Sequence, residues 1–165
     1  MALLNSLLGS GMSSRLFLNI REKGLAYSVG SLPELAVDTG ALFVFAGFNI
    51  GRINEALSAV LKELRRLKTE LVGEAELAKA REKQKGPLLF HLEDPEAVAE
   101  WYGKQEVLKD EIQTEEEYLP KIEAVKAAEI KSLANDLFKP QNLNLAIIGP
   151  YSKSQRDQLY NLLKI

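Results

Sequence analysis

Residues 7–29 read LLGSGMSSRLFLNIREKGLAYSV, and the order of signals in this stretch decides the fold. Leucines at helical spacing over residues 3–8 predict a first helix, which the glycines at 9 and 11 end. A serine then caps a second short helix, and Gly24 is a candidate left-handed stop for it. From Leu25 onward the pattern becomes extended. The stretch therefore predicts two short helices followed by a strand.

Two runs downstream of Gly24 favour strands. Residues 25–35 are expected to be extended, and residues 39–48 are rich in aromatic and β-branched side chains that alternate along the chain. The turn at 38–40 between them predicts an antiparallel hairpin. Because both faces of the second run are apolar over part of its length, we expect it to be a central strand. A short apolar run over Leu143–Ile148 predicts a third strand.

Helical periodicity dominates the rest of the chain. The clearest stripe places apolar residues at spacings of three and four from Ile53 to Leu71. The predicted helices cover residues 53–71, 74–85 (ended or kinked at Gly86-Pro87), 94–108, 114–125, 130–138 and a last stretch around 159–163. Strands and helices are segregated along the sequence. This order predicts a single α+β domain over residues 1–165, with helices packed on one face of a mainly antiparallel sheet.

The composition leaves little material for an active site. The 165 residues carry 21 Lys+Arg against 23 Asp+Glu, a net charge of −2, which argues against nucleic acid and anionic membranes as partners. There is no cysteine and one histidine, His91, so disulfides, Cys-ligated zinc and thiol catalysis are excluded. This sequence has no signal peptide and no apolar run long enough to span a membrane, so we expect a cytoplasmic location.

The opening stretch resembles the pitrilysin-type zinc metallopeptidases, a family that includes the insulin-degrading enzyme and mitochondrial processing peptidase. The resemblance is carried by Gly-Met-Ser-Ser-Arg-Leu-Phe at 11–17 and Arg-Glu-Lys-Gly-Leu-Ala-Tyr at 21–27. Further matches follow in order at 38–42, 76–81, 122–125 and 143–150, so the resemblance covers nearly the whole chain. It is a resemblance to the domain that follows the catalytic one, and it implies the α+β metallohydrolase fold of that family.

The chain departs from the family pattern in three ways. The H-x-x-E-H zinc motif is absent, because the one histidine stands in the sequence His-Leu-Glu-Asp at 91–94. Arg21 and Tyr27 are six positions apart, one fewer than usual in the family, which leaves the direction of Arg21 open. The family domain normally begins with a strand, whereas this chain starts at the helix. We therefore expect a piece of a longer chain without its first strand, and one sheet edge that is bare or covered by a second copy in a homodimer.

The resemblance implies a non-catalytic domain of a zinc metallopeptidase. Such a domain contributes to peptide-substrate binding and to closure of a chamber opposite the zinc-bearing domain of the same or a partner chain. It also implies that Arg21 and Tyr27 contact the substrate, since a guanidinium binds carbonyl oxygens and a phenol can donate to an oxyanion. No catalytic residue, metal ligand or cofactor is expected on this chain. The zinc belongs to the partner domain, and this chain alone should neither bind zinc tightly nor cleave peptides.

Other interpretations remain open. The same fold serves as structural core subunits without proteolytic activity in relatives of mitochondrial processing peptidase, and a free-standing α+β binding module is a third class. From the residues alone, the favoured interpretation of Arg21 and Tyr27 is a solvated arginine at a helix end and an ordinary strand tyrosine. The glycines and serines at 9–14 lack the Walker Lys-Ser/Thr ending and are interpreted as a turn between helices. His91 is interpreted as a surface residue near a helix start.

Overall fold

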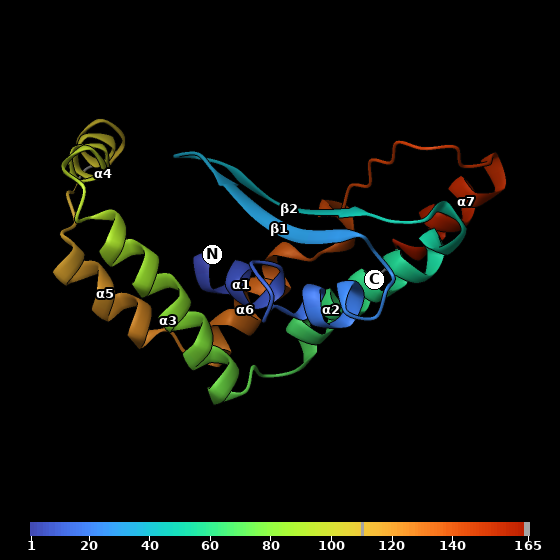
Figure 1. Cartoon of the computed structure of the whole chain (residues 1–165), viewed down its shortest axis with the longest axis horizontal. Coiled ribbons are helices and arrows are strands. Elements are labelled where there is room, and N and C mark those ends of the chain that lie inside the picture. The colour runs from blue at the N-terminus through green and yellow to red at the C-terminus, as the bar shows by residue number, and fades with distance from the viewer. Residues whose placement is uncertain (110, 164–165) are drawn as a thin grey trace.

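The computed structural model describes residues 1–109 and 111–163. Figure 1 shows a two-stranded hairpin laid across a group of helices, with a pair of long helices extending to one side. The helices are α1 (Ala2–Leu8), a π-helical turn (Phe17–Arg21), α2 (Ile53–Thr69), α3 (Glu74–His91), α4 (Pro95–Leu108), α5 (Glu115–Ala124), α6 (Ala127–Leu137) and α7 (Lys153–Leu162). Short 3₁₀ turns at Ile50–Arg52 and Pro140–Asn142 precede α2 and follow α6.

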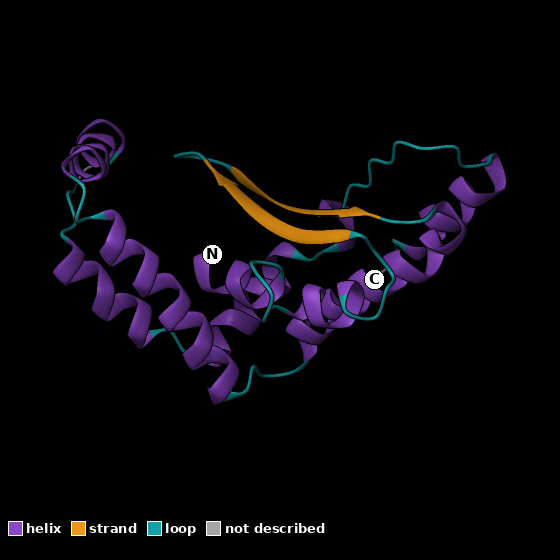
Figure 2. Cartoon of the chain, viewed as in Figure 1, coloured by secondary structure: helices purple, strands orange, loops and turns teal. Residues whose placement is uncertain are grey.

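The hairpin that the turn at 38–40 predicts is present. Strands β1 (Ser28–Leu35) and β2 (Gly40–Gly47) pair antiparallel, with a register that runs from Ser28 opposite Gly47 to Leu35 opposite Gly40. The Ala36 N–H donates to the Thr39 carbonyl at 2.8 Å and closes the turn. Figure 2 shows both strands above the helices, with the helices on one side of the sheet. The prediction of an α+β fold with helices packed on one face is confirmed.

The core lies between the hairpin and the helices beneath it. Helix α1 packs against β1 and α3, and α2 packs against α6, so the first helix is surrounded on several sides. The side chains that are fully buried there are Leu4, Leu8, Leu16, Ile20, Leu67 and Leu77. Leu7, Leu8, Leu16 and Ile20 of the stretch quoted above are therefore core residues, which explains their helical spacing.

Helices α3, α4 and α5 form the extension to one side of the core (Figure 1). The predicted helix starts are confirmed: the Asp94 carboxylate accepts the Glu96 N–H at 3.0 Å, and Thr114 forms a capping box with Glu117. Trp101 on α4 packs edge-on against Tyr118 on α5 with ring centroids 5.5 Å apart. Helix α3 continues through Pro87 to His91 and is not interrupted there.

Two predictions about strands are wrong. Residues 143–148 form no strand, and β2 is not central, because within the described residues it pairs with β1 alone. The run at 143–148 has the composition of a strand, yet a strand exists only where its N–H and C=O groups meet a neighbouring backbone. Strand β2 is apolar on both faces because Phe43 and Phe45 lie half exposed on the side away from the helices. The apolar side chains on both faces of β2 were therefore not evidence for a second neighbouring strand.

Candidate functional site

The segment between Arg21 and Tyr27 joins the first part of the core to β1. Its helical part is wide: Glu22 N–H donates to the Phe17 carbonyl, and Leu25 N–H donates to the Ile20 carbonyl, each at 2.9 Å and each across five residues. Gly24 then has φ +66, the left-handed conformation that favours glycine, as the sequence predicts. Its N–H donates to the Arg21 carbonyl at 3.0 Å. The segment is thus a defined turn with its own hydrogen bonds.

Arg21 and Tyr27 stand at the two ends of this turn. The Tyr27 N–H donates to the Gly47 carbonyl at 2.7 Å, which fixes the backbone of Tyr27 to the end of β2. The side chain of Tyr27 is 69% exposed, and Arg21 is also exposed. In the described parts of the chain neither side chain has a hydrogen-bond or ion-pair partner. The structure therefore places both side chains at the surface of one turn, and over residues 1–109 and 111–163 neither forms a hydrogen bond or ion pair with a protein group.

Arg52 also belongs to this site, and it is not among the residues expected from the sequence. From the 3₁₀ turn before α2, its Nη1 donates to the Gly24 carbonyl at 3.0 Å. Its Nε and Nη2 donate to the two carboxylate oxygens of Glu55, at 2.9 and 3.0 Å. These hydrogen bonds raise the pKa of Arg52 and lower the pKa of Glu55 from their ordinary values. The Arg-x-x-Glu spacing at a helix start is a visible signal for the ion pair, but nothing in it points to Gly24, 28 residues earlier.

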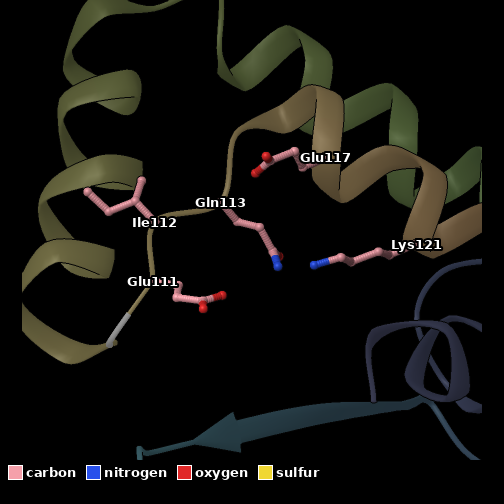
Figure 3. A pocket seen from close by; sticks show the side chains of 5 residues that line it. All are labelled: Glu111, Ile112, Gln113, Glu117 and Lys121. Carbon is pink, nitrogen blue, oxygen red and sulfur yellow. The ribbon is translucent and has the colours of Figure 1, made fainter.

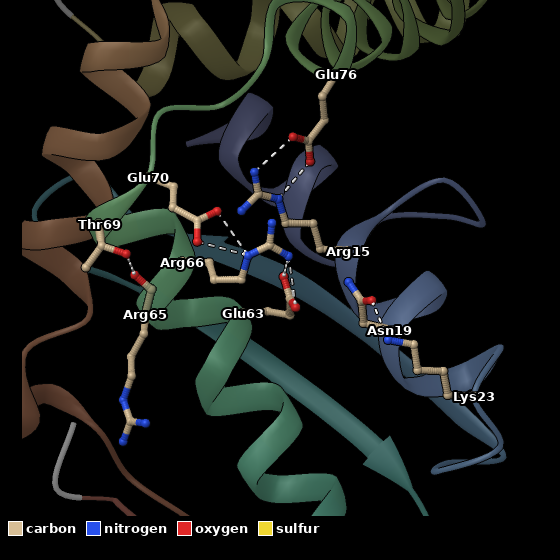
Figure 4. Close-up of polar contacts among 9 residues, drawn as sticks. All are labelled: Arg15, Asn19, Lys23, Glu63, Arg65, Arg66, Thr69, Glu70 and Glu76. Carbon is tan, nitrogen blue, oxygen red and sulfur yellow. Dashed lines mark hydrogen bonds and ion pairs between the residues drawn. The ribbon is translucent and has the colours of Figure 1, made fainter.

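An ion pair between Arg15 and Glu76 lies next to the helical turn that ends at Arg21. Figure 4 shows Arg15 pointing toward Glu76 of α3, with the pair Asn19 and Lys23 farther along the chain. The Arg15 Nε and Nη2 donate to the two oxygens of Glu76 at 2.7 and 2.9 Å, and the Arg15 side chain is 8% exposed. This pair joins the helical turn that carries Arg21 to α3. The Arg15 guanidinium is buried in this pair, whereas the Glu76 side chain is 36% exposed.

The hollows of the surface lie elsewhere. Figure 3 shows one of ≈ 590 Å³ between the start of α5 and the segment before it, lined by Glu111, Ile112, Gln113, Glu117 and Lys121. A second of ≈ 700 Å³ lies between α2 and α7 and is lined by Asn54, Glu55, Ser58, Gln158, Asn161 and Leu162. Neither contains Arg21 or Tyr27. Arg21 and Tyr27 therefore lie outside these two hollows, although Glu55, the partner of Arg52, lines the second one.

The donor groups do not fit a catalytic zinc ion. Over residues 1–109 and 111–163, no three His, Cys, Asp or Glu side chains lie close enough together to hold a metal. The chain has one histidine and no cysteine, whereas a catalytic zinc site needs three protein ligands. His91 lies at the end of α3, away from the turn. The same described residues contain no helix with the length and hydropathy needed to cross a bilayer.

Comparison with known proteins identifies the family. The family model described as the peptidase M16 inactive domain matches residues 1–84, the part that holds α1, the turn with Arg21 and Tyr27, the hairpin and α2. The chain belongs to the peptidase M16 family. This match confirms the resemblance to pitrilysin-type metallopeptidases and to the domain that lacks the zinc motif.

Individual relatives of this M16 domain agree with the family assignment. A zinc protease of Bacillus subtilis, YmxG, is 34% identical over 148 residues, which cover 89% of this chain and 36% of the relative. A protease structure from Helicobacter pylori superposes with a TM-score of 0.71 at 29% identity, over 84% of this chain and 34% of the other. A chain of complex III from Candida albicans has a TM-score of 0.75 at 19% identity over 99% of this chain and 42% of its own. The M16 domain spans about a third of the length of the curated relatives that it matches.

Proposed function

We propose that this M16 inactive domain holds an extended peptide substrate opposite a zinc-bearing catalytic domain and helps to close a chamber around it. The observation that carries the proposal is the turn at 21–27. It lies inside the stretch that the family model matches, and it presents Arg21 and Tyr27 to solvent on a backbone fixed by hydrogen bonds. A solvent-exposed arginine and tyrosine whose side chains have no hydrogen-bond or ion-pair partner among the described residues are available to a group from outside the domain.

The chemistry of the two side chains supports substrate contact. The Arg21 guanidinium has five N–H donors in one plane, which suits the carbonyl groups of an extended peptide. The Tyr27 hydroxyl can donate one hydrogen bond to the negative charge that forms on a peptide carbonyl oxygen during hydrolysis. Both are donors, so both favour oxygen atoms of the substrate. The metal that activates water would come from the catalytic domain, in the same or a partner chain.

The experiment compares variants of the intact polypeptide or complex that carries the zinc-bearing domain. Arg21→Ala and Tyr27→Phe should each lower kcat/KM for peptide cleavage, Tyr27→Phe by about 100-fold if its hydroxyl donates to the oxyanion. Two controls match them: Tyr160 is 70% exposed on α7, and Arg156 on the same helix is exposed. Tyr160→Phe and Arg156→Ala should leave cleavage unchanged. Full activity of both the Arg21 and the Tyr27 variant would refute the proposed substrate contact.

A structural subunit without proteolytic activity is the second candidate function. The observation in its favour is the match to a complex III chain over 99% of this domain, which shows that this fold also occurs within a large assembly. In such a role Arg21 and Tyr27 would have no effect on catalysis. Unchanged cleavage by their variants, together with loss of assembly when the exposed sheet face at Phe43 and Phe45 is made polar, would favour this second function.

A further inference from the structure

We infer that Arg52 is a positioning residue for Arg21, acting through the carbonyl of Gly24. The inference rests on the proposed function of the turn at 21–27, because it assigns to Arg52 the orientation of a proposed substrate contact. Arg52 lies outside the turn, in the 3₁₀ turn that precedes α2, and its side chain donates a hydrogen bond to the backbone of the turn at Gly24.

Burial differs between the two ends of the turn at 21–27. Leu25 and Ala26, near Tyr27, are 8% and 4% exposed, so packing fixes that end. Residues 22–24, next to Arg21, are exposed, and a Cβ placed on Gly24 would meet no atom within 4 Å. Packing therefore does not hold residues 22–24, although Ile20 on the other side of Arg21 is fully buried. The 3.0 Å hydrogen bond from Arg52 to the Gly24 carbonyl is the long-range contact that restrains residues 22–24.

The geometry of the Arg52 guanidinium fixes the direction of its hydrogen bond to Gly24. A guanidinium is planar, and Glu55 occupies its Nε and Nη2 with both carboxylate oxygens at 2.9 and 3.0 Å. Once these two bonds are made, the remaining Nη1 points in a fixed direction, and the Gly24 carbonyl lies there. Glu55 thus orients Arg52, and Arg52 restrains Gly24. A single ammonium group could not make all three bonds in one plane.

The hydrogen bond from Arg52 to Gly24 also restrains the turn that separates Arg21 from Tyr27. The turn between them holds five residues, and Gly24 reverses the chain in a left-handed conformation at φ +66. A glycine in such a turn has few steric restraints of its own, so hydrogen bonds hold its backbone: the Arg21 carbonyl accepts its N–H, and Arg52 donates to its carbonyl. Arg52 supplies that restraint at one point, on the side of Arg21. We therefore expect loss of Arg52 to loosen Arg21 and to leave Tyr27 in place.

The first test uses this chain alone and measures amide hydrogen exchange. Arg52→Ala should speed exchange at Gly24 by about tenfold, the change for loss of roughly one hydrogen bond, while the Tyr27 amide exchanges as before. Glu55→Ala should act in the same direction and less strongly. Arg156→Ala, which removes another exposed arginine paired with a carboxylate, should change neither site. Unchanged exchange at Gly24 in Arg52→Ala would overturn the inference.

The second test is a double-mutant cycle for peptide cleavage in the zinc-bearing polypeptide or complex. If Arg52 acts through Arg21, Arg52→Ala lowers kcat/KM by about tenfold in the wild-type background and has no further effect in Arg21→Ala. In Tyr27→Phe the Arg52 effect should persist in full. Equal effects of Arg52→Ala in all three backgrounds would mean a general structural role and would refute the inference. Full activity of both Arg21→Ala and Tyr27→Phe would instead refute the proposed function, and hydrogen exchange would still decide the role of Arg52 at Gly24.

Discussion

Arg15 and Glu76 form two parallel hydrogen bonds, at 2.7 and 2.9 Å, between residues 61 positions apart. They join the helical turn that carries Arg21 to the start of α3 (Figure 4). The Arg15 side chain is 8% exposed and its Nη1 is buried without a partner, so Glu76 is the group that balances its charge. Removal of Glu76 would leave a buried, unbalanced guanidinium.

Glu76→Ala should therefore destabilise the domain by about 2 kcal/mol, below the full cost of breaking a buried pair because Glu76 is 36% exposed. Urea unfolding followed by circular dichroism measures the change in the free energy of unfolding. Glu100→Ala breaks an exposed pair with Lys104 and serves as the control. Equal midpoints for the two variants would show that burial of Arg15 does not matter.

Gly9 should tolerate no side chain. A Cβ at this position would lie 2.5 Å from both the N and the Oγ of Ser31 on β1, and the Gly9 carbonyl accepts the Ser31 N–H at 3.2 Å. Gly9→Ala therefore forces the end of α1 away from the sheet, with an expected cost of about 1–3 kcal/mol. Gly73→Ala is the matched control, since a Cβ there would meet no atom within 4 Å. Thermal unfolding of both variants checks the prediction, and a stable Gly9→Ala would contradict the packing described for α1 and β1.

The contact between Arg52 and Glu55 should fail in acid. The hydrogen bond from Arg52 lowers the pKa of Glu55 below its ordinary value, so the charged pair contributes stability at neutral pH. That contribution is lost as the pH falls through the lowered pKa. The Gly24 amide resonance should then shift with a midpoint below the ordinary pKa of 4.5 for a glutamate. In Glu55→Gln the same resonance should not follow this titration; an identical curve in the variant would assign the shift to another group.

One edge of β2 has no neighbouring strand in the part of the chain that the structure describes, and this free edge should support self-association of the chain. In an antiparallel ladder, hydrogen-bonded pairs of residues alternate with pairs whose N–H groups point away from the partner strand. The bond from the Ala36 N–H to the Thr39 carbonyl fixes which pairs are bonded. The N–H groups of β2 that point to its free edge are therefore those of Leu42, Val44 and Ala46. Residues 40–47 contain no charged side chain, although natural edge strands commonly carry one to prevent pairing. We therefore predict a homodimer with two β2 strands paired antiparallel.

Light scattering after size exclusion checks this dimer. Ala46→Pro removes an N–H from the free edge and leaves the bonds to β1 intact, so it should give a monomer. Ala46→Val keeps the N–H and should remain a dimer. A monomeric wild-type chain, or a dimeric Ala46→Pro variant, would contradict pairing through this edge.

The sequence predicts local features of this domain well. The left-handed Gly24, the cap at Asp94 and the capping box at Thr114 each depend on a few neighbouring residues, and each is present. The stretch at 7–29 likewise indicates the family, which the match over residues 1–84 confirms. These signals are readable because the hydrogen bonds that they describe form within one or two turns of chain.

Long-range pairing is the part that the sequence does not predict. The apolar run at 143–148 and the two apolar faces of β2 both indicate additional strand pairing, yet apolarity does not say which backbone lies beside a strand. The contacts of Arg15 with Glu76 and of Arg52 with Gly24 join residues 61 and 28 positions apart. No spacing in the sequence relates these partners. For the same reason Arg21 and Tyr27 come from the family resemblance and not from periodicity.

Photo-crosslinking at position 27 tests the central claim most directly. Photoreactive p-benzoylphenylalanine replaces Tyr27 in the intact polypeptide or complex, with zinc removed so that a labelled peptide substrate is bound and not cleaved. The same residue at position 160 is the control, because Tyr27 and Tyr160 are 69% and 70% exposed. Substrate contact predicts strong, competable crosslinking to the peptide from position 27 and none from position 160. Equal yields from both positions, or none from position 27, would contradict the proposed role of this turn.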